Sequence, residues 1–241
     1  VRERNMNIAL IIAGGSGQRM RQEIPKQFLN VNDKPVIIYT LEAFQSHPDI
    51  DKIGVVCLDG WYDILRAYAR QYGIDKLDWI VSGGENGQAS IRNGVFEAER
   101  RYAGDDIILV HDAIRPMVSQ EIISDCIVQC KKHGSAIVVT PCNTVVLKRA
   151  TGESSREVIP REQLAVTQTP QAFPIRRLAN AHRKALELGI TNSIASCTLM
   201  AELGEEVFFS IGAETNIKLT TPDDLKIFKA LLALRDANTR I

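Results

Sequence analysis

Short apolar runs alternate along this chain with longer segments of helical periodicity, and this alternation restricts the folds open to it. The expected strands are residues 8–13, 52–58, 79–81, 106–110, 135–140 and 207–210. The expected helices are residues 41–45, 61–72, 90–101, 120–133, 175–188, 196–203 and 222–234. Because strands that alternate with helices form mostly parallel sheets covered on both faces, we predict an α/β fold. Its sheet is doubly wound and Rossmann-like, in a single domain over residues 1–241.

One stretch, at about residues 142–168, breaks this alternation. Residues 143–149 and 157–161 are extended in character, and a polar turn at residues 150–156 separates them. Two such segments joined by a polar turn predict a β-hairpin. We expect this β-arm to project from the sheet and to need a partner surface.

The first apolar run leads directly into a glycine-rich loop, Gly14-Gly15-Ser16-Gly17, and the cations Arg19 and Lys26 follow. Glycines can adopt positive φ, and without a Cβ they let backbone N–H groups approach phosphate oxygens. Arg19 can bind phosphate through two parallel hydrogen bonds, and Lys26 can act as a compact point charge. The segment predicts a polyphosphate site; the alternative is a tight turn with two solvated cations.

The spacing of this loop excludes two commoner phosphate-binding motifs. No Lys-Ser or Lys-Thr pair follows Gly17, as a Walker loop requires. The glycines also lack the GxGxxG spacing of the dinucleotide-binding fingerprint, and no acidic residue follows at the expected distance. An oxidoreductase is therefore the least favoured class.

A second candidate site is the segment Val110–Pro116, in which Asp112 and Arg115 follow an apolar strand. An aspartate at the carboxyl end of a strand can hold a metal, orient a sugar hydroxyl or pair with a cation. Arg115 can bind phosphate. The alternative is an internal ion pair between Asp112 and Arg115. For His111 we expect a packed, hydrogen-bonded side chain rather than a catalytic one.

Two further segments carry polar candidates. The loop Ser82–Ser90 is again rich in glycine, so its backbone can recognise a base edge, and Ser90 can cap a helix or bind phosphate. A plain loop is the alternative. Near the C-terminus, Lys218 lies in an expected strand and needs an anionic partner, for which phosphate is a candidate. Thr221 is expected to cap the last helix.

The charges give no net field, since 29 Lys and Arg balance 29 Asp and Glu. We therefore expect no nucleic-acid partner and no membrane partner.

The longest apolar run is far shorter than a membrane span, and the first residues lack the apolar core of a signal peptide, so we expect a cytoplasmic protein. The five cysteines form no Cys-x-x-Cys pair, which indicates buried free thiols rather than a zinc site or a disulfide framework.

Five ordered motifs together resemble the 2-C-methyl-D-erythritol 4-phosphate cytidylyltransferase family, which also includes the ribitol-5-phosphate cytidylyltransferases. They lie at residues 13–20, 25–27, 110–116, 168–173 and 216–225, and the resemblance runs from about residue 7 to residue 232. It implies a nucleotidyltransferase that moves CMP from CTP to a polyol phosphate and releases pyrophosphate. Positioning and electrostatic stabilisation would supply most of the catalysis.

The resemblance also implies roles for particular residues. Catalytic residues around the CTP phosphates are Arg19, Lys26 and Lys218. Nucleotide-binding residues are Ala13, Gly14, Gly15, Ser16, Gly17, Gly83, Gly84, Ser90 and Asp112. Acceptor-binding residues are Asp112, Arg115, Thr144, Arg161 and Thr169. The implied cofactor is Mg²⁺ or another divalent cation, held mainly by the CTP phosphates with Asp112 as the candidate protein ligand. The implied assembly is a homodimer in which the arm, carrying Thr144 and Arg161, contributes to the neighbour's site.

Two departures from the family pattern leave the acceptor open. Gly87 occurs where an arginine is usual, and Ala195 occurs where a carboxylate is expected near the acceptor. A lost hydrogen-bonding group changes which polyol is recognised. The acceptor is therefore either 2-C-methyl-D-erythritol 4-phosphate, for isoprenoid synthesis, or a relative such as ribitol 5-phosphate, for a cell-surface polymer. A nucleotidyltransferase that uses another NTP and a non-catalytic nucleotide-binding relative remain alternatives.

Overall fold

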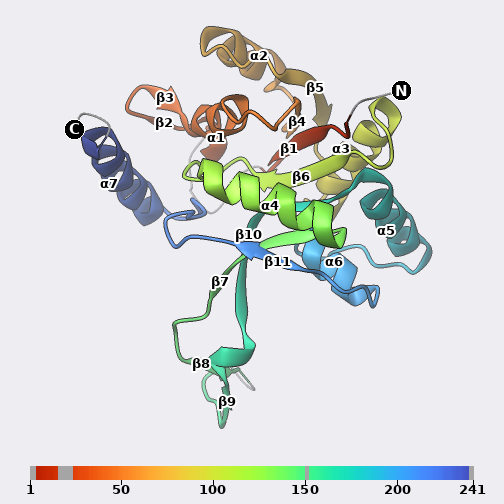
Figure 1. Ribbon diagram of the computed structural model, residues 1–241. Coiled ribbons are helices and arrows are strands. Elements are labelled where there is room, and N and C mark those ends of the chain that lie inside the picture. Colours follow the sequence, from red (N-terminus) through yellow and green to blue (C-terminus); the bar gives the residue numbers. More distant parts are fainter. Residues whose placement is uncertain (1–3, 16–23, 150–151, 239–241) are drawn as a thin grey trace.

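The computed structural model describes residues 4–15, 24–149 and 152–238, and a seven-stranded sheet forms its centre (Figure 1). The strand order is β11-β7-β10-β6-β1-β4-β5. These strands are β1 (Asn7–Ala13), β4 (Lys52–Cys57), β5 (Leu77–Ser82), β6 (Ile107–Asp112), β7 (Ala136–Pro141), β10 (Ala165–Pro174) and β11 (Phe209–Ile211). All six strands predicted from the apolar runs are present, which confirms the α/β fold.

The sheet is parallel except for β10. β1 pairs in parallel with β4 and β6, β4 with β5, and β11 with β7, whereas β10 is antiparallel to both β6 and β7. The sequence pattern missed β10 because its segment contains Pro170 and Pro174 and because its register shifts between Thr167 and Gln171. Prolines and bulges both break the alternation by which a strand is recognised.

The main helices occur where the periodicity predicts them. They are α1 (Val36–Gln45), α2 (Tyr62–Gln71), α3 (Gly87–Arg101), α4 (Gln120–His133), α5 (Ile175–Glu187), α6 (Ser196–Glu202) and α7 (Pro222–Asn238). α1 begins five residues before the predicted start at residue 41, because its first turn is a run of β-branched residues that resembles a strand. Among these helices, none is both long and apolar enough to cross a membrane.

Helices cover both faces of the sheet, as the pattern predicts. In β1, Ala9 and Ile11 point into a cluster that includes buried residues of α1, α2 and α4. Ile8 and Leu10 point to the opposite face, into a cluster with residues of α3, α5 and α6. Because successive side chains of a strand alternate between faces, a continuous apolar run such as β1 belongs in the middle of a sheet buried on both sides.

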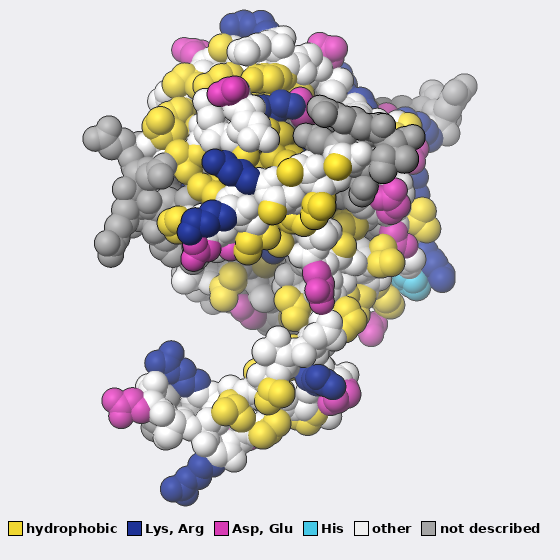
Figure 2. Space-filling view, turned by 90° about the vertical axis from the view of Figure 1, so that its left-hand side faces the viewer, with side chains coloured by type: hydrophobic (Ala, Val, Ile, Leu, Met, Phe, Trp, Pro, Cys, Tyr) yellow, Lys and Arg dark blue, Asp and Glu magenta, His cyan; other side chains and the backbone are white. Residues whose placement is uncertain are grey.

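The predicted hairpin forms and extends away from the sheet. β8 (Val146–Lys148) pairs antiparallel with β9 (Glu157–Ile159), and the hairpin lies well below the body of the molecule (Figure 1). Figure 2 shows hydrophobic side chains on this arm, and Val145, Leu147 and Val158 are all more than half exposed. β10 continues from this region into the sheet, so residue 168, the predicted end of the arm, falls inside one continuous strand.

Two short elements and a helix cap complete the surroundings of the site. A 3-10 helix, η2 (Lys26–Phe28), precedes the small hairpin of β2 (Asn30–Val31) and β3 (Lys34–Pro35), and η3 (Arg161–Gln163) precedes β10. At the start of α7, the Asp224 N–H donates to Thr221 Oγ1 at 3.3 Å, and the Thr221 N–H donates to the Asp224 carboxylate at 2.7 Å. This reciprocal pair confirms Thr221 as the cap.

Candidate active site

Two adjoining cavities open at the carboxyl ends of the central strands. β1 lies between β4 and β6, so the strand order reverses at β1, and ligands of open α/β sheets bind at such a point. The glycine-loop cavity, of about 530 Å³, is lined by residues that include Ala13, Gly14, Gly15, Lys26, Gly84 and Ser90. The β6 cavity, of about 320 Å³, is lined by residues that include His111, Arg115, Gln168, Thr169, Ala195 and Ser196. Both cavities share Ile12, Gly87, Asp112 and Lys218.

The two glycine loops contact each other through their backbones. A Cβ placed on Gly14 would lie 3.2 Å from the Gly83 Cα, and a Cβ on Gly84 would lie 2.4 Å from the Ala89 Cβ. Neither Gly14 nor Gly15 uses the freedom to adopt positive φ. At Gly84 other atoms approach the backbone too closely for a side chain, and at Gly14 a Cβ would require Gly83 to move by a few tenths of an ångström.

Gln27, which was not predicted as a site residue, holds the first loop in place. Its buried Nε2 donates to the carbonyl oxygens of Ala13 at 2.7 Å and Gly15 at 3.0 Å. Two backbone carbonyls are thereby turned toward the amide. The sequence signal was the Pro25-Lys26-Gln27 motif, but nothing in it distinguishes a loop-holding amide from a ligand-binding one.

Ser90 holds the second loop rather than capping α3. Asn86 is the cap, since its side chain accepts the Ala89 N–H at 2.9 Å. Ser90 Oγ lies one turn further along and accepts the Gly84 N–H at 3.0 Å. The capping role expected for Ser90 is therefore wrong, because the helix begins three residues before the predicted start.

Asp112 pairs with two cations at the boundary of the cavities. Its carboxylate accepts from Arg115 Nε at 3.2 Å, and the Lys218 ammonium lies 3.0 Å from Oδ2 and 3.1 Å from Oδ1. The alternative of an internal Asp112–Arg115 ion pair is thus confirmed, with Lys218 as a second partner. Burial would raise the pKa of Asp112, but the charges of Lys218 and Arg115 outweigh it and hold that pKa below its usual value.

Lys218 does not lie in a strand, contrary to the sequence expectation. The segment is irregular; Leu219 N–H donates to the Ile114 carbonyl at 2.9 Å, and Arg115 Nη1 donates to the Asn216 carbonyl at 2.7 Å. The strand-like alternation arises because Ile217 and Leu219 pack into the small core under α7. Lys218, between them, points instead toward Asp112.

A chain of hydrogen bonds lies behind Asp112. Thr169 Oγ1 accepts the Asp112 backbone N–H at 3.1 Å and lies 3.0 Å from His111 Nδ1. His111 Nε2 lies 3.2 Å from the Arg115 carbonyl oxygen. The imidazole is fully buried, and this burial lowers the pKa of His111 to about 4. The expectation of a packed, hydrogen-bonded His111 is confirmed.

Several predicted residues are not brought together here. Ser16, Gly17 and Arg19 lie outside the described residues. Thr144 and Arg161 lie on the arm, and neither is among the described residues that line the two cavities. Gly87 and Ala195 are the two residues that depart from the family pattern. Gly87 is the first residue of α3 and has open space where a side chain would begin. Ala195 precedes α6 and lines the β6 cavity.

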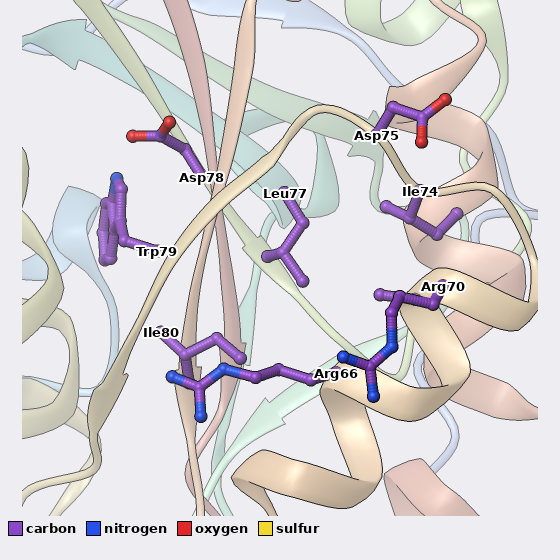
Figure 3. A pocket seen from close by; sticks show the side chains of 9 residues that line it. Arg66, Arg70, Ile74, Asp75, Leu77, Asp78, Trp79 and Ile80 are labelled. Carbon is purple, nitrogen blue, oxygen red and sulfur yellow. The ribbon is translucent and has the colours of Figure 1, made fainter.

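A third cavity, of about 280 Å³, lies elsewhere, between α2 and the edge strand β5. Figure 3 shows Arg66 and Arg70 on α2 and the side chains of Leu77, Trp79 and Ile80 on β5. None of the predicted site residues lines it. The two cavities at the carboxyl ends of the strands, which gather loops from distant parts of the chain, form the candidate active site.

The chain matches known proteins over nearly its whole length. The model of the 2-C-methyl-D-erythritol 4-phosphate cytidylyltransferase family matches residues 7–234. A ribitol-5-phosphate cytidylyltransferase from Lacticaseibacillus paracasei is 43% identical over 229 residues, covering 94% of this chain and 98% of the relative. A 2-C-methyl-D-erythritol 4-phosphate cytidylyltransferase from Clostridium botulinum is 33% identical, covering 94% and 97%. The crystal structure of a 4-diphosphocytidyl-2C-methyl-D-erythritol synthase is 27% identical with a TM-score of 0.78, covering 95% and 99%. The chain therefore belongs to the 2-C-methyl-D-erythritol 4-phosphate cytidylyltransferase family.

Proposed function

We propose that this protein transfers the cytidylyl group of CTP to ribitol 5-phosphate and releases pyrophosphate. The arrangement that carries the proposal is the pair of cavities that meet at Asp112 and Lys218, because a two-substrate transfer needs two ligands held in contact. The choice of ribitol 5-phosphate follows the relatives, since a ribitol-5-phosphate cytidylyltransferase is 43% identical to this chain and a methylerythritol-phosphate enzyme 33%.

The glycine-loop cavity suits CTP. Its volume of about 530 Å³ lies in the range of small-molecule sites, and two glycine loops supply bare backbone along one wall. Lys26 and Lys218 both line this cavity and add positive charge. We assign the triphosphate to these two lysines and the cytidine to the loop that contains Gly83, Gly84 and Ser90. Arg19 is expected to add a third cation.

The β6 cavity suits a polyol phosphate. Its lining contains the hydroxyls of Thr167 and Thr169, the amide of Gln168 and the cations Arg115 and Lys218. Hydroxyl and amide groups can each hydrogen-bond a sugar hydroxyl, and the cations can attract the acceptor phosphate. Because Lys218 lines both cavities, we expect it to contact both phosphates.

The chemistry is a single displacement. A phosphate oxygen of the acceptor forms a bond to the α-phosphorus of CTP while the bond from that phosphorus to the bridging oxygen breaks, and pyrophosphate leaves with the bond's electron pair. Lys26 and Lys218 stabilise the negative charge that gathers on the phosphate oxygens. This reaction needs no proton from the protein, because the attacking phosphate is already ionised.

The described donor groups fit a divalent cation that the nucleotide holds. No group of three or more His, Cys, Asp or Glu side chains forms a metal cage in the described part of the chain. Asp112 is one carboxylate at the boundary of the cavities, and Mg²⁺ is commonly bound by one or two carboxylates together with substrate phosphates. Bound Mg²⁺ would neutralise triphosphate charge, and Asp112 is the side chain that would help to hold it.

The proposal includes a homodimer in which each arm completes the neighbouring site. Thr144 and Arg161 lie on the projecting arm, and the arm carries exposed Val145, Leu147 and Val158. A second copy of the chain is the occupant we assign to this apolar surface, because an isolated hairpin with such side chains gains stability only when they are covered. We place the enzyme in the cytoplasm, in keeping with its five free thiols, four of them buried.

Nucleotide selectivity tests the reaction. The protein is incubated with Mg²⁺, ribitol 5-phosphate and one of CTP, UTP, GTP or ATP, and pyrophosphate release is measured. The expected result is release with CTP at a rate well above the other three. Equal release with UTP contradicts the cytidylyl assignment, and no release with any nucleotide favours a non-catalytic binding protein.

A further inference from the structure

His111 occupies a particular place relative to the Asp112 carboxylate. It is the residue before a tight turn that the Arg115 N–H closes by donating to the Asp112 carbonyl at 3.1 Å. The imidazole contacts the last residue of that turn directly, through the Arg115 carbonyl at 3.2 Å. It contacts the first residue through Thr169, whose Oγ1 lies 3.0 Å from Nδ1 and 3.1 Å from the Asp112 nitrogen. One side chain thus holds both ends of the turn.

The hydrogen-bond partners determine where the imidazole proton lies. The Arg115 carbonyl can only accept, so His111 Nε2 must carry the proton and donate it. The Asp112 N–H can only donate, so Thr169 Oγ1 must accept it. In a neutral imidazole, Nδ1 is then the acceptor of the single hydroxyl proton of Thr169. Of the two neutral tautomers, only the Nε2–H form satisfies all these bonds.

The turn that His111 spans presents two of the charged groups of the site. The Asp112 carboxylate and the Arg115 guanidinium both project from it and bond to each other at 3.2 Å. Arg115 also reaches the Asn216 carbonyl at 2.7 Å and so fixes the segment that carries Lys218. A shift of the turn would therefore move Asp112, Arg115 and Lys218 together.

We infer that His111, as the neutral Nε2–H tautomer, is a positioning residue that sets the orientation of Asp112 and Arg115 between the two cavities. This inference rests on the proposed function for the reaction that those residues serve. The imidazole itself is buried and lies against the Phe44 ring, with centroids 5.0 Å apart, so it acts through Thr169 and Arg115.

A second histidine shows what a purely structural role looks like in this chain. His47 is 1% exposed, its Nε2 lies 2.9 Å from Ser124 Oγ, and its Nδ1 accepts the Asp49 N–H at 3.1 Å. It is as buried and as well bonded as His111, but it is not among the described residues that line either cavity. His47→Leu is therefore a matched control for His111→Leu.

Three substitutions separate the two bonds of His111. His111→Asn retains an acceptor near the Nδ1 position, His111→Gln retains a donor near the Nε2 position, and His111→Leu retains neither. We expect His111→Leu to lower kcat/KM for the acceptor by about tenfold or more, with KM for CTP changed by less than about twofold. His111→Asn and His111→Gln are expected to recover part of this loss. His47→Leu is expected to lower the melting temperature without lowering kcat/KM.

Thr169→Val tests whether Thr169 and His111 act as a unit. If they do, the double variant His111→Leu/Thr169→Val loses no more activity than the more damaged single variant. If the losses of activity in the two single variants add up in the double variant, His111 does not act through Thr169. Equal effects of His111→Leu and His47→Leu, confined to stability, would reduce His111 to a packing role and overturn the inference.

Nitrogen NMR of the ¹⁵N-histidine wild-type protein tests the tautomer without any turnover. The expected result is a protonated Nε2 and an unprotonated Nδ1 for His111 at neutral pH, and a protonated Nδ1 would overturn the inference. The assay uses whichever acceptor the wild type converts. A wild type that converts none refutes the proposed function, while the tautomer and the shift of the Asp112 and Arg115 amide signals in His111→Leu still decide the inference.

Discussion

The Lys218 ammonium lies 3.0 Å from the Asp112 carboxylate, although 106 positions separate the two residues in the sequence. This ion pair joins the end of β6 to the segment before α7 at the place where the two cavities meet. Arg115 pairs with the same carboxylate at 3.2 Å. One negative charge is thus shared by two cations, which leaves the boundary of the cavities positive and suited to phosphates.

Lys218→Met removes one of these cations while keeping most of the side-chain volume. We expect kcat to fall by about 100-fold, because a charge that stabilises a phosphoryl-transfer transition state typically contributes about 2–4 kcal/mol. Lys218 is 41% exposed, so the free energy of unfolding should change little. Steady-state kinetics and urea denaturation measure the two quantities. Lys226→Met, at an exposed lysine of α7 paired with Asp223, is the control and should leave both unchanged.

Gln27→Leu removes the amide that holds the first glycine loop. The carbonyls of Ala13 and Gly15 lose a donor, and we expect KM for CTP to rise by about tenfold with a stability loss of about 1–3 kcal/mol. Isothermal titration with CTP and thermal unfolding measure these effects. The matched control is Gln120→Leu, since the Gln120 amide also donates to a backbone carbonyl, that of Ala43, away from the cavities. CTP affinity that falls equally in both variants would contradict the assigned role of Gln27.

Gly84→Ala tests the close approach between the second glycine loop and α3. The new Cβ would lie 2.4 Å from the Ala89 Cβ, so the backbone must shift, and we expect a loss of about 1–3 kcal/mol in the free energy of unfolding. Gly87→Ala places a methyl group in open space at the start of the same helix, and its effect should be within about 1 kcal/mol of zero. Similar stabilities of the two variants in urea denaturation would contradict the claim that the contact with Ala89 excludes a side chain at position 84.

Subunit mixing tests the arm. Arg161→Ala and Lys218→Met should each be nearly inactive alone, but in a heterodimer with exchanged arms one of the two sites contains both native residues. Random reassociation is then expected to restore up to about a quarter of the wild-type rate. No recovery on mixing, with dimers verified by sedimentation, would mean that Arg161 does not serve a neighbour's site.

His182 makes stability depend on pH. Burial, and then the charge of Arg92, lowers the pKa of His182 to about 4, and neither ring nitrogen has a hydrogen-bond partner in the described structure. Between pH 6.5 and pH 4 the unfolded chain binds a proton there and the folded protein does not, so stability falls as the pH falls. From pH 7 to pH 5, wild type should lose about 2 kcal/mol more than His182→Leu. Equal losses in urea denaturation would contradict this assignment.

The sequence predicted the elements better than it predicted their contacts. Strands such as β1 and helices such as α4 follow from hydrophobic periodicity alone. The pattern does not reveal β10, because its prolines and its register shift interrupt the alternation of a strand. Apolar Ile217 and Leu219 on either side of Lys218 predict a strand, but these two side chains pack into the small core under α7 instead. Hydrophobic periodicity indicates that a residue is buried, but it does not indicate which element packs against it.

The candidate site was only partly predictable. The glycine loops and Asp112 were found because their residue types and spacing have a direct chemical meaning. The functions of Gln27 and His111 depend on bonds to distant backbone groups, such as the Ala13 and Arg115 carbonyls, and no spacing in the sequence encodes those contacts. Family resemblance supplied the reaction type, but it did not select the acceptor.

A direct competition between the two acceptors tests the proposed reaction. Equal concentrations of ribitol 5-phosphate and 2-C-methyl-D-erythritol 4-phosphate are incubated with limiting CTP, Mg²⁺ and the protein, and the products are measured by mass spectrometry. We predict that CDP-ribitol is the main product and that it forms with release of an equal amount of pyrophosphate. A main product of 4-diphosphocytidyl-2-C-methyl-D-erythritol would contradict it.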